Sequence, residues 1–456
     1  MSTLLVKNAH TLVTMDAERR EIKGGSLFVR GGVIEQIGVS EKLPIEADEI
    51  LDLRGRYIVL PGLVNTHHHF YQVLTRAVPG AQASELFGWL KTLYPIWANL
   101  TSEGVYTSAM MAAAELMLSG CTTSSDHLYL FPNDCTVDDE IRAVRNIGMR
   151  FHASRGSMSV GASNGGLPPD SLVESEDHIL NDSRRLIETY HDNRRHSMLR
   201  LTLAPCSPFS VSTDLMKESA ALARSYPGVR LHTHLAENQL DVSYSLEKFG
   251  LTPTQYAESL GWTGPDVWHA HCVKLDEHGI QCFARTGTGV AHCPTSNMRL
   301  GSGVMPLRRM LRAGVPIGLG VDGAASNDSS NMLHEARSAF LLARVGEQDA
   351  AALTARQALE LATLGGAQVL GRDDIGHLAV GMSADFVAIN VDRPQFSGAE
   401  WDIVAALVFC QADSVDFSFI NGRKVVAHGH LVTCDLESLT EKTNILSRHL
   451  KSLRLS

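Results

Sequence analysis

The sequence lacks the features of several protein classes. It has no uninterrupted apolar run of about 18 residues, so no membrane span is expected, and its first residues lack the basic segment and long apolar run of a signal peptide. Its eight cysteines are scattered without C-x-x-C pairs, which favours reduced thiols in a cytoplasmic protein. The net charge of -10, with no basic cluster to offset it, argues against nucleic acid as a partner.

What the sequence does contain is typical of a folded globular protein. Hydrophobic residues make up 44% of the chain and charged residues 20%, which argues against disorder. A chain of 456 residues is long enough for one large barrel and a smaller companion domain.

The chain is organised around residues 60–70, which read L-P-G-L-V-N-T-H-H-H-F. The apolar, β-branched run at residues 57–60 predicts a buried strand with histidines at its carboxyl end. Because side chains alternate along a strand, His67 and His69 are expected to face one way and His68 the other. Two imidazoles on one face can hold a metal ion, whereas the alternative is a histidine-rich surface tract.

The segments on either side predict a two-domain architecture. Residues 1–56 are predicted to form short strands, and residues 372–430 complete the same β-sandwich, with a hairpin at Asn421-Gly422. Residues 57–371 alternate strands and helices, which predicts an α/β domain, a (β/α)₈ TIM barrel. Residues 431–456 are predicted to be a helical tail. After the first strand, the candidate barrel strands are residues 122–126, 150–154, 200–204, 230–234, 267–270, 289–292 and 316–321.

Polar residues follow several of these candidate strands. His234 and Glu237 come at the end of the fifth, His271 at the end of the sixth and Asp322 at the end of the eighth. Such barrels carry their catalytic groups at the carboxyl ends of the strands. Imidazoles and a carboxylate in this arrangement are typical of a zinc or iron site.

These residues lie in motifs that resemble the amidohydrolase superfamily, in particular its mononuclear aminohydrolases and chlorohydrolases. The motifs are H-x-H after P-G-L, H-x-x-E, A-H-C, H-C-P-T-S-N and D-G-A-A-S-N, in that order. The resemblance implies one divalent metal ion, with Zn²⁺ expected and Fe²⁺ as the alternative because imidazole suits both. It also implies a small heterocyclic substrate and a homo-oligomer.

The resemblance further implies roles for individual residues. The implied metal ligands are His67, His69, His234 and Asp322, and His271 is expected to contact the attacking water or the substrate. Within H-T-H, only His234 has the H-x-x-E spacing to Glu237. His232 is then either a core residue or a partner of a metal ligand.

Binuclear members of the superfamily carry a carboxylated lysine at the end of the fourth strand. Residues 200–208 contain no lysine, so one metal ion is expected. Cys206 lies there instead, and a lone cysteine is more often a small buried apolar residue than a nucleophile.

The implied reaction is hydrolytic deamination. A metal ion lowers the pKa of bound water from 15.7 to about 7, which makes hydroxide available to attack a ring carbon that bears an amino group. Asp322 is expected to take the proton of the water, His271 to hold the water in line, and Glu237 to protonate the adjacent ring nitrogen before ammonia leaves.

The resemblance of the loops to those of related enzymes implies an oxidised purine as the substrate. Residues 94–97 and 165–168 lack the glutamate and arginine that bind ribose in related nucleoside deaminases, whereas residues 67–72, 154–159 and 165–170 resemble bacterial 8-oxoguanine deaminases, which produce uric acid. The expected substrate contacts are Gln72, Trp97, Arg155 and Cys206. The alternatives are core packing for Trp97 and a salt bridge at the barrel mouth for Arg155.

Other functions stay open at this point. Guanine, isoxanthopterin or a cytosine-like ring would use the same site, and so would a triazine chlorohydrolase, although Glu237 as an acid suits ammonia better than chloride as a leaving group. A metal-free scaffold is the non-enzymatic alternative. The metal site of a non-haem iron oxygenase uses two histidines and a carboxylate, which is one histidine fewer than the set found here. The cytidine-deaminase fold is excluded because its H-x-E and P-C-x-x-C spacing is missing.

Overall fold

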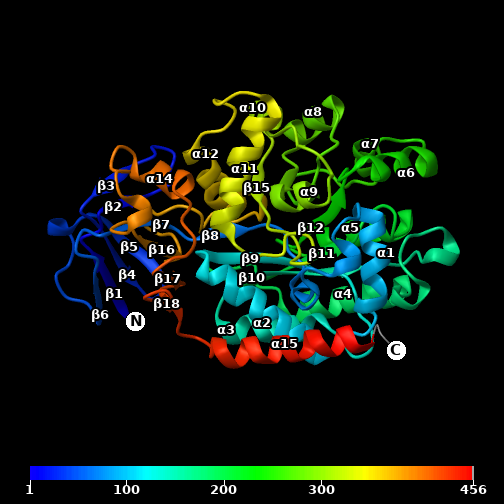
Figure 1. Ribbon diagram of the computed structural model, residues 1–456, viewed down its shortest axis with the longest axis horizontal. Coiled ribbons are helices and arrows are strands. Elements are labelled where there is room, and N and C mark those ends of the chain that lie inside the picture. Colours follow the sequence, from blue (N-terminus) through cyan, green and yellow to red (C-terminus); the bar gives the residue numbers. More distant parts are fainter. Residues whose placement is uncertain (454–456) are drawn as a thin grey trace.

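The protein contains a closed barrel of eight parallel strands, which confirms the predicted (β/α)₈ fold. The computed structural model describes residues 1–453 (Figure 1). Each barrel strand pairs with the next along the chain, and β15 closes onto β8 through Leu319 and Asn65. The strands are β8 (Leu63–Asn65), β9 (Cys121–Leu128), β10 (Arg150–Ser157), β11 (Leu199–Pro205), β12 (Arg230–Leu235), β13 (Val267–His271), β14 (Gly289–His292) and β15 (Ile317–Leu319).

Helices surround the barrel, and local sequence signals mark the ends of some of them. Thr136 starts α3 with a capping box and Gly148, at φ 87°, ends it. The helices are α1 (Leu86–Trp97), α2 (Ser102–Leu118), α3 (Val137–Ile147), α4 (Glu176–Tyr190), α5 (Thr213–Arg224), α6 (Gln239–Phe249), α7 (Pro253–Ser259), α8 (Glu277–Thr286), α9 (Pro294–Arg299), α10 (Leu307–Ala313), α11 (Met332–Glu347), α12 (Ala355–Glu360), a π-helical turn (Leu361–Gly365) and α13 (Gly366–Val369).

The two ends of the chain build one β-sandwich, at the left of Figure 1. Strand β16 runs antiparallel to β7, which lies parallel to β2, so distant segments share a sheet. Asn421 and Gly422 both have positive φ in the turn between β17 and β18, as the hairpin signal predicts. The strands are β1 (Thr3–Lys7), β2 (Thr11–Val13), β3 (Glu21–Lys23), β4 (Gly25–Arg30), β5 (Val33–Val39), β6 (Glu49–Asp52), β7 (Tyr57–Pro61), β16 (Phe386–Asn390), β17 (Phe417–Ile420), β18 (Arg423–Ala427) and β19 (His430–Leu431).

The first predicted barrel strand is in fact two strands in two sheets. Tyr57–Pro61 (β7) pairs within the sandwich, and the short strand Leu63–Asn65 (β8) begins the barrel and leads to the histidines. Gly62 joins them in a tight space, because a Cβ there would lie 2.1 Å from Thr122 Oγ1. The structural boundary therefore follows residue 61, whereas the sequence placed it after residue 56; an apolar run predicts a buried strand but does not identify its sheet.

Two helices belong to the C-terminal part. α14 (Ile403–Phe409) packs on α11 and α12 within a segment that was predicted to contain strands. α15 (Leu436–Leu453) forms the predicted tail helix, of which residues 454–456 lie outside the described part. It lies along α2 (Figure 1), and Ser447 Oγ donates to Leu74 O, 2.8 Å away, in the 3₁₀ segment Phe70–Thr75 (η2). The tail helix therefore supports the loop that follows the histidine triplet.

Apolar side chains fill a core in each domain. In the sandwich, Leu4, Leu27, Phe386 and Phe419 are buried together, and the two phenylalanine rings stack with centroids 4.6 Å apart. Among residues 1–453, none of the helices combines the length and the apolar character that a membrane crossing requires.

Candidate metal centre and active site

Four side chains from opposite sides of the barrel converge at the carboxyl ends of its strands. His67 Nε2 lies 3.3 Å and His69 Nε2 3.4 Å from Asp322 Oδ1, and His69 Nε2 lies 3.2 Å from His234 Nε2. Zinc bonds of about 2.0–2.1 Å in a tetrahedron separate neighbouring ligand atoms by about 3.3–3.4 Å. His67 Nε2 is also buried without a hydrogen-bond partner. The donor set therefore fits a divalent cation such as Zn²⁺.

Backbone carbonyls orient two of the three histidines. His69 Nδ1 lies 2.7 Å from His127 O, and His234 Nδ1 lies 2.6 Å from Cys206 O. Because a carbonyl oxygen only accepts, each Nδ1 carries the proton and each Nε2 keeps its lone pair for a cation. His67 differs, since its Nδ1 lies 2.8 Å from Nε2 of another imidazole, His232.

Asp322 is held as a carboxylate. Its Oδ2 accepts hydrogen bonds from Ser296 Oγ at 2.6 Å and Ser326 Oγ at 3.0 Å, and its Oδ1 accepts one from Gly323 N at 2.7 Å. Burial raises the pKa of Asp322, but the interactions with His67 and the other nearby histidines outweigh it and hold the pKa well below its ordinary value. The group is therefore available as an anionic ligand and as a proton acceptor.

Glu237 and His271 lie beside this carboxylate. His271 Nε2 is 3.5 Å from Glu237 Oε2 and 3.8 Å from Asp322 Oδ2, and Asn297 Oδ1 orients the ring by accepting from His271 Nδ1 at 2.9 Å. Burial, the largest effect on Glu237, raises its pKa to about 7. Burial lowers the pKa of His271, but the carboxylates of Glu237 and Asp322 outweigh it and raise the pKa above its ordinary value. With a pKa of about 7, the Glu237 carboxyl group can donate a proton near neutral pH.

The backbone around these groups is unusual. Ala236, His271 and Asp322 have φ values of 51°, 69° and 63°, in the left-handed region that non-glycine residues rarely adopt. Each follows or ends a different barrel strand. Such conformations concentrate at functional sites, where the surrounding structure holds them.

A narrow cavity opens above the convergent groups. Its free space of about 30 Å³ holds about one water molecule. Helix α1 closes one side of it, and the carboxyl ends of the barrel strands with the loops that follow them close the rest. The lining residues are His69, Gln72, Leu86, Trp89, Leu90, Tyr94, Tyr129, Cys206, Ser207, Phe209, His234, Glu237, His271, Leu300 and Asp322.

Two of the four expected substrate contacts line this cavity. Gln72 Oε1 accepts from Ala325 N at 3.3 Å, which leaves its buried Nε2 without a partner. Burial raises the pKa of Cys206 to about 12, so its thiol stays neutral and is a wall group rather than a nucleophile.

The other two expected contacts do not line it. Arg155 donates to Glu174 at 2.9 and 2.8 Å and to Asp182 at 3.1 Å, which is the salt-bridge alternative. Trp97 is fully buried, and its Nε1 donates to Thr75 Oγ1 at 3.0 Å, which is the core-packing alternative. Both side chains already have partners, so neither has a free polar group for a substrate.

The aromatic wall comes instead from an earlier part of the same helix. Trp89 and Tyr94 of α1 line the cavity. Trp97 lies behind them, with its ring centroid 5.4 Å from that of Trp89 and 6.0 Å from that of Tyr94. The tryptophan that the sequence singled out therefore packs against the wall of the cavity and does not line it.

The structure also brings in residues that the sequence did not single out. His127, at the end of β9, donates from Nε2 to Ala204 O at 2.7 Å and has a buried Nδ1 without a partner. Its ligand atom lies within 4.8 Å of those of His67, His69 and His234. The available signal for His127 was its position at the end of a predicted strand. The available signal for Ser296 and Asn297 was their place in the H-C-P-T-S-N motif.

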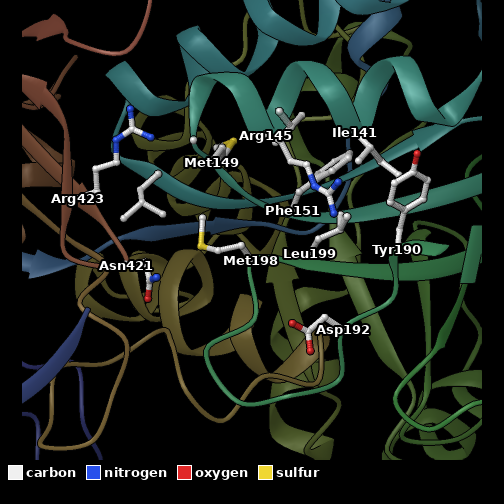
Figure 2. A pocket seen from close by; sticks show the side chains of 13 residues that line it. Ile141, Arg145, Met149, Phe151, Tyr190, Asp192, Met198, Leu199, Asn421 and Arg423 are labelled. Atoms are coloured by element: carbon white, nitrogen blue, oxygen red, sulfur yellow. The ribbon is translucent and has the colours of Figure 1, made fainter. Parts of the chain in front are cut away.

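A second cavity, of about 330 Å³, lies at the amino ends of β10 and β11 (Figure 2). Figure 2 shows Arg423, from the sandwich, and Tyr190, from α4, at opposite ends of it. Among residues 1–453, Asp192 is the only acidic residue that lines it, and no histidine does. It therefore has no set of groups comparable with the metal centre.

Comparisons with known proteins agree with this geometry. Residues 58–452 match the amidohydrolase family. The chain is 44% identical over 441 residues to 8-oxoguanine deaminase of Pseudomonas aeruginosa, covering 96% of this chain and 97% of the relative. It is 37% identical over 455 residues to hydroxydechloroatrazine ethylaminohydrolase of Pseudomonas sp. (strain ADP), covering 95% and 93%.

Solved structures agree as well. The crystal structure of atrazine chlorohydrolase from Arthrobacter aurescens TC1, complexed with zinc, superposes with a TM-score of 0.93 at 31% identity, covering 97% of this chain and all of that one. The match to the family extends over most of the chain and includes every group of the metal centre. The chain therefore belongs to the amidohydrolase family.

Proposed function

We propose that this protein is a zinc-dependent aminohydrolase that converts 8-oxoguanine and water into uric acid and ammonia. The observation that carries the hydrolytic activity is the convergence of His67, His69, His234 and Asp322 beside Glu237. The substrate is inferred from the 44% identity to an 8-oxoguanine deaminase and from a cavity with aromatic walls and polar groups.

The metal ion is proposed to be held by the three histidines through Nε2 and by Asp322 through Oδ1. When bound, it would supply Lewis acidity and a water molecule that loses a proton near neutral pH. Zn²⁺ fits the spacing of the donors, and one ion is proposed because no lysine ends β11.

The protein's own residues move the protons. Asp322 Oδ2 faces His271, so Asp322 accepts the proton of the attacking water while His271 holds the oxygen in line. As a C–O bond forms at the carbon bearing the amino group, Glu237 donates a proton to the adjacent ring nitrogen. The amino nitrogen then takes the proton held by Asp322, and the C–N bond breaks so that ammonia leaves. The new hydroxyl group returns a proton to Glu237 as it becomes the carbonyl.

Substrate binding requires the cavity to widen. A bicyclic ring exceeds a free space of about 30 Å³, so the groups that line the cavity must move apart. Trp89 and Tyr94 would then lie against a planar ring, and Gln72 Nε2 would donate to its edge.

Ammonia release by the zinc-loaded protein tests the proposal, with 8-oxoguanine, guanine, isoxanthopterin, adenosine and cytosine compared side by side. We expect kcat/KM for 8-oxoguanine to exceed the others by orders of magnitude. A pterin or nucleoside in first place would overturn the substrate assignment and leave the hydrolytic chemistry in place.

A chlorotriazine belongs in the same assay, because the zinc-bound structural relative is a chlorohydrolase. Chloride release in place of ammonia would show that the leaving group has been misassigned. Glu237→Gln is the matched control for both products, since it keeps the size of the side chain and removes the acid.

A further inference from the structure

His232 is a buried histidine of β12 that contacts a proposed metal ligand without itself facing the centre. Its Nε2 lies 2.8 Å from His67 Nδ1, and its Nδ1 lies 3.0 Å from Trp268 O. His69 and His234 lack such a partner, because each is held directly by a backbone carbonyl. His67 is the ligand histidine whose orientation depends on another side chain.

The direction of these hydrogen bonds follows from the carbonyl at one end. Trp268 O only accepts, so His232 Nδ1 must carry a proton, and in the neutral ring Nε2 then accepts. His67 Nδ1 therefore donates, which leaves the lone pair of His67 Nε2 free. His67 Nδ1 and His232 Nε2 cannot both carry a proton at this distance. When both rings are neutral, the Trp268 carbonyl therefore fixes the tautomer of His232, and His232 fixes that of His67.

The position of His232 is fixed from several sides. Its ring stacks on the Trp268 indole, with centroids 4.4 Å apart and planes at 17°. The indole Nε1 in turn donates to Thr66 O at 3.1 Å, next to His67. Strands β12 and β8 are four places apart in the closed ring of eight, so the contact crosses the barrel interior beneath the metal centre.

We propose that His232 is a positioning residue for the metal centre, which holds His67 in the Nδ1-protonated tautomer with Nε2 directed at the cation. This inference rests on the proposed metal site but not on the identity of the substrate. It assigns to the first histidine of H-T-H a function that is separate from its contribution to core packing.

Three variants separate hydrogen bonding from packing. In His232→Gln, Oε1 occupies about the position of Nε2 and keeps the acceptor for His67. In His232→Asn, the shorter amide keeps the donor to Trp268 O but does not reach His67. His232→Leu fills the space without either bond.

Zinc affinity, measured by competition with a chelator, is the readout that packing alone would not change. We expect His232→Asn and His232→Leu to bind zinc about 10- to 100-fold more weakly, the usual effect of losing a partner of a metal ligand, and His232→Gln to stay within about tenfold of the wild type. Equal affinity in all four proteins would overturn the proposal.

His269→Leu is the matched control. His269 is equally buried on the neighbouring strand, stacks on Phe283 and bonds Trp262 O at 3.0 Å, but contacts no proposed ligand. We expect it to lower the free energy of unfolding without weakening zinc binding. If zinc affinity follows unfolding free energy across all the variants, His232 has only a packing function.

The zinc-free wild type supplies a test that needs no His232 variant. Nitrogen-15 NMR distinguishes the two neutral tautomers, and the His67 signals are assigned by comparison with His67→Gln. We expect His67 to be protonated at Nδ1, and protonation at Nε2 would overturn the proposal. Failure of the wild type to bind zinc would instead disprove the proposed function itself.

Discussion

The two ends of the barrel both bury polar and charged side chains, but they satisfy them differently. At the amino end, Arg150 makes a two-pronged ion pair with Asp385, at 2.7 and 2.9 Å, and Arg372 makes one with Asp374, at 2.8 Å for both bonds. At the carboxyl end, buried atoms of His67, Gln72 and Glu237 have no partner, and Gln72 and Glu237 line the same cavity. The amino end also has unpartnered atoms, such as His152 Nδ1, but His152 does not line that cavity.

The difference separates a structural role from a functional one. Buried charges that hold each other stabilise the junction of barrel and sandwich, since Asp385 precedes β16 and also accepts from Asn421 N at 2.7 Å. Buried groups without partners cost free energy unless something binds them, and at the carboxyl end a cation and a substrate would do so.

The largest expected effect comes from removing a ligand at the carboxyl end. We expect His69→Gln to lose zinc and to lower kcat/KM by more than about 10³-fold, because the hydroxide that the ion makes available is lost. Metal analysis and ammonia release measure both losses. His68→Gln is the control, since His68 Nε2 faces Ser330 Oγ instead, 2.9 Å away, and this variant should retain zinc.

Glu237→Gln should separate chemistry from metal binding. The amide cannot donate the carboxylic proton, so we expect kcat to fall by about 10²- to 10⁴-fold while the zinc content stays at the wild-type level. Turnover and metal content are measured on the same sample. A Glu237→Gln enzyme with wild-type turnover would remove the role given to this residue.

At the amino end the expected effect is on stability alone. Asp385→Asn leaves the buried Arg150 guanidinium without its counter-charge, which should lower the free energy of unfolding by about 3–5 kcal/mol. Denaturant unfolding measures this, and zinc bound per folded molecule should not change. The exposed pair of Arg56 and Asp392 is the control, since Asp392→Asn should cost less than about 1 kcal/mol.

The pH dependence should report the acid at the carboxyl end. Burial raises the pKa of Glu237 to about 7, and the reaction needs its protonated form. The protonated fraction falls as the pH rises through this value, so kcat/KM should fall up to tenfold per pH unit above about pH 7. A bound cation lowers the pKa and moves the fall to lower pH. The pH profile of Glu237→Gln should lack this decrease in kcat/KM.

The smallest expected effects distinguish the two tryptophans of α1. Trp97→Phe removes the hydrogen bond to Thr75, so we expect about 0.5–1.5 kcal/mol less stability and an unchanged KM. Trp89→Phe changes the cavity wall and should raise KM by about 2- to 13-fold, equivalent to about 0.5–1.5 kcal/mol. Steady-state kinetics and unfolding of both variants measure the contrast, and a larger KM effect at Trp97 would reverse the assignment.

The sequence by itself determined the barrel and the strands of a companion sheet, and its resemblance to the amidohydrolase superfamily implied the proposed metal ligands. The predicted strand at residues 289–292 coincides with β14, and the tail helix begins near where its pattern does. Periodicity, caps and turn residues act over a few positions, so these elements can be read locally. The H-x-H and H-x-x-E spacings are likewise local and follow strands whose carboxyl ends must meet.

Only the tertiary structure decided which sheet each strand joins and what each side chain contacts. The apolar run that begins at Tyr57 would suit either sheet. Its pairing with β16 depends on a segment more than 300 residues away. Arg155 and Trp97 have chemistry that suits either a substrate or a neighbour, and distant partners such as Glu174 decided between them. His232 meets His67 across the barrel, a contact that depends on closure of the whole ring of strands.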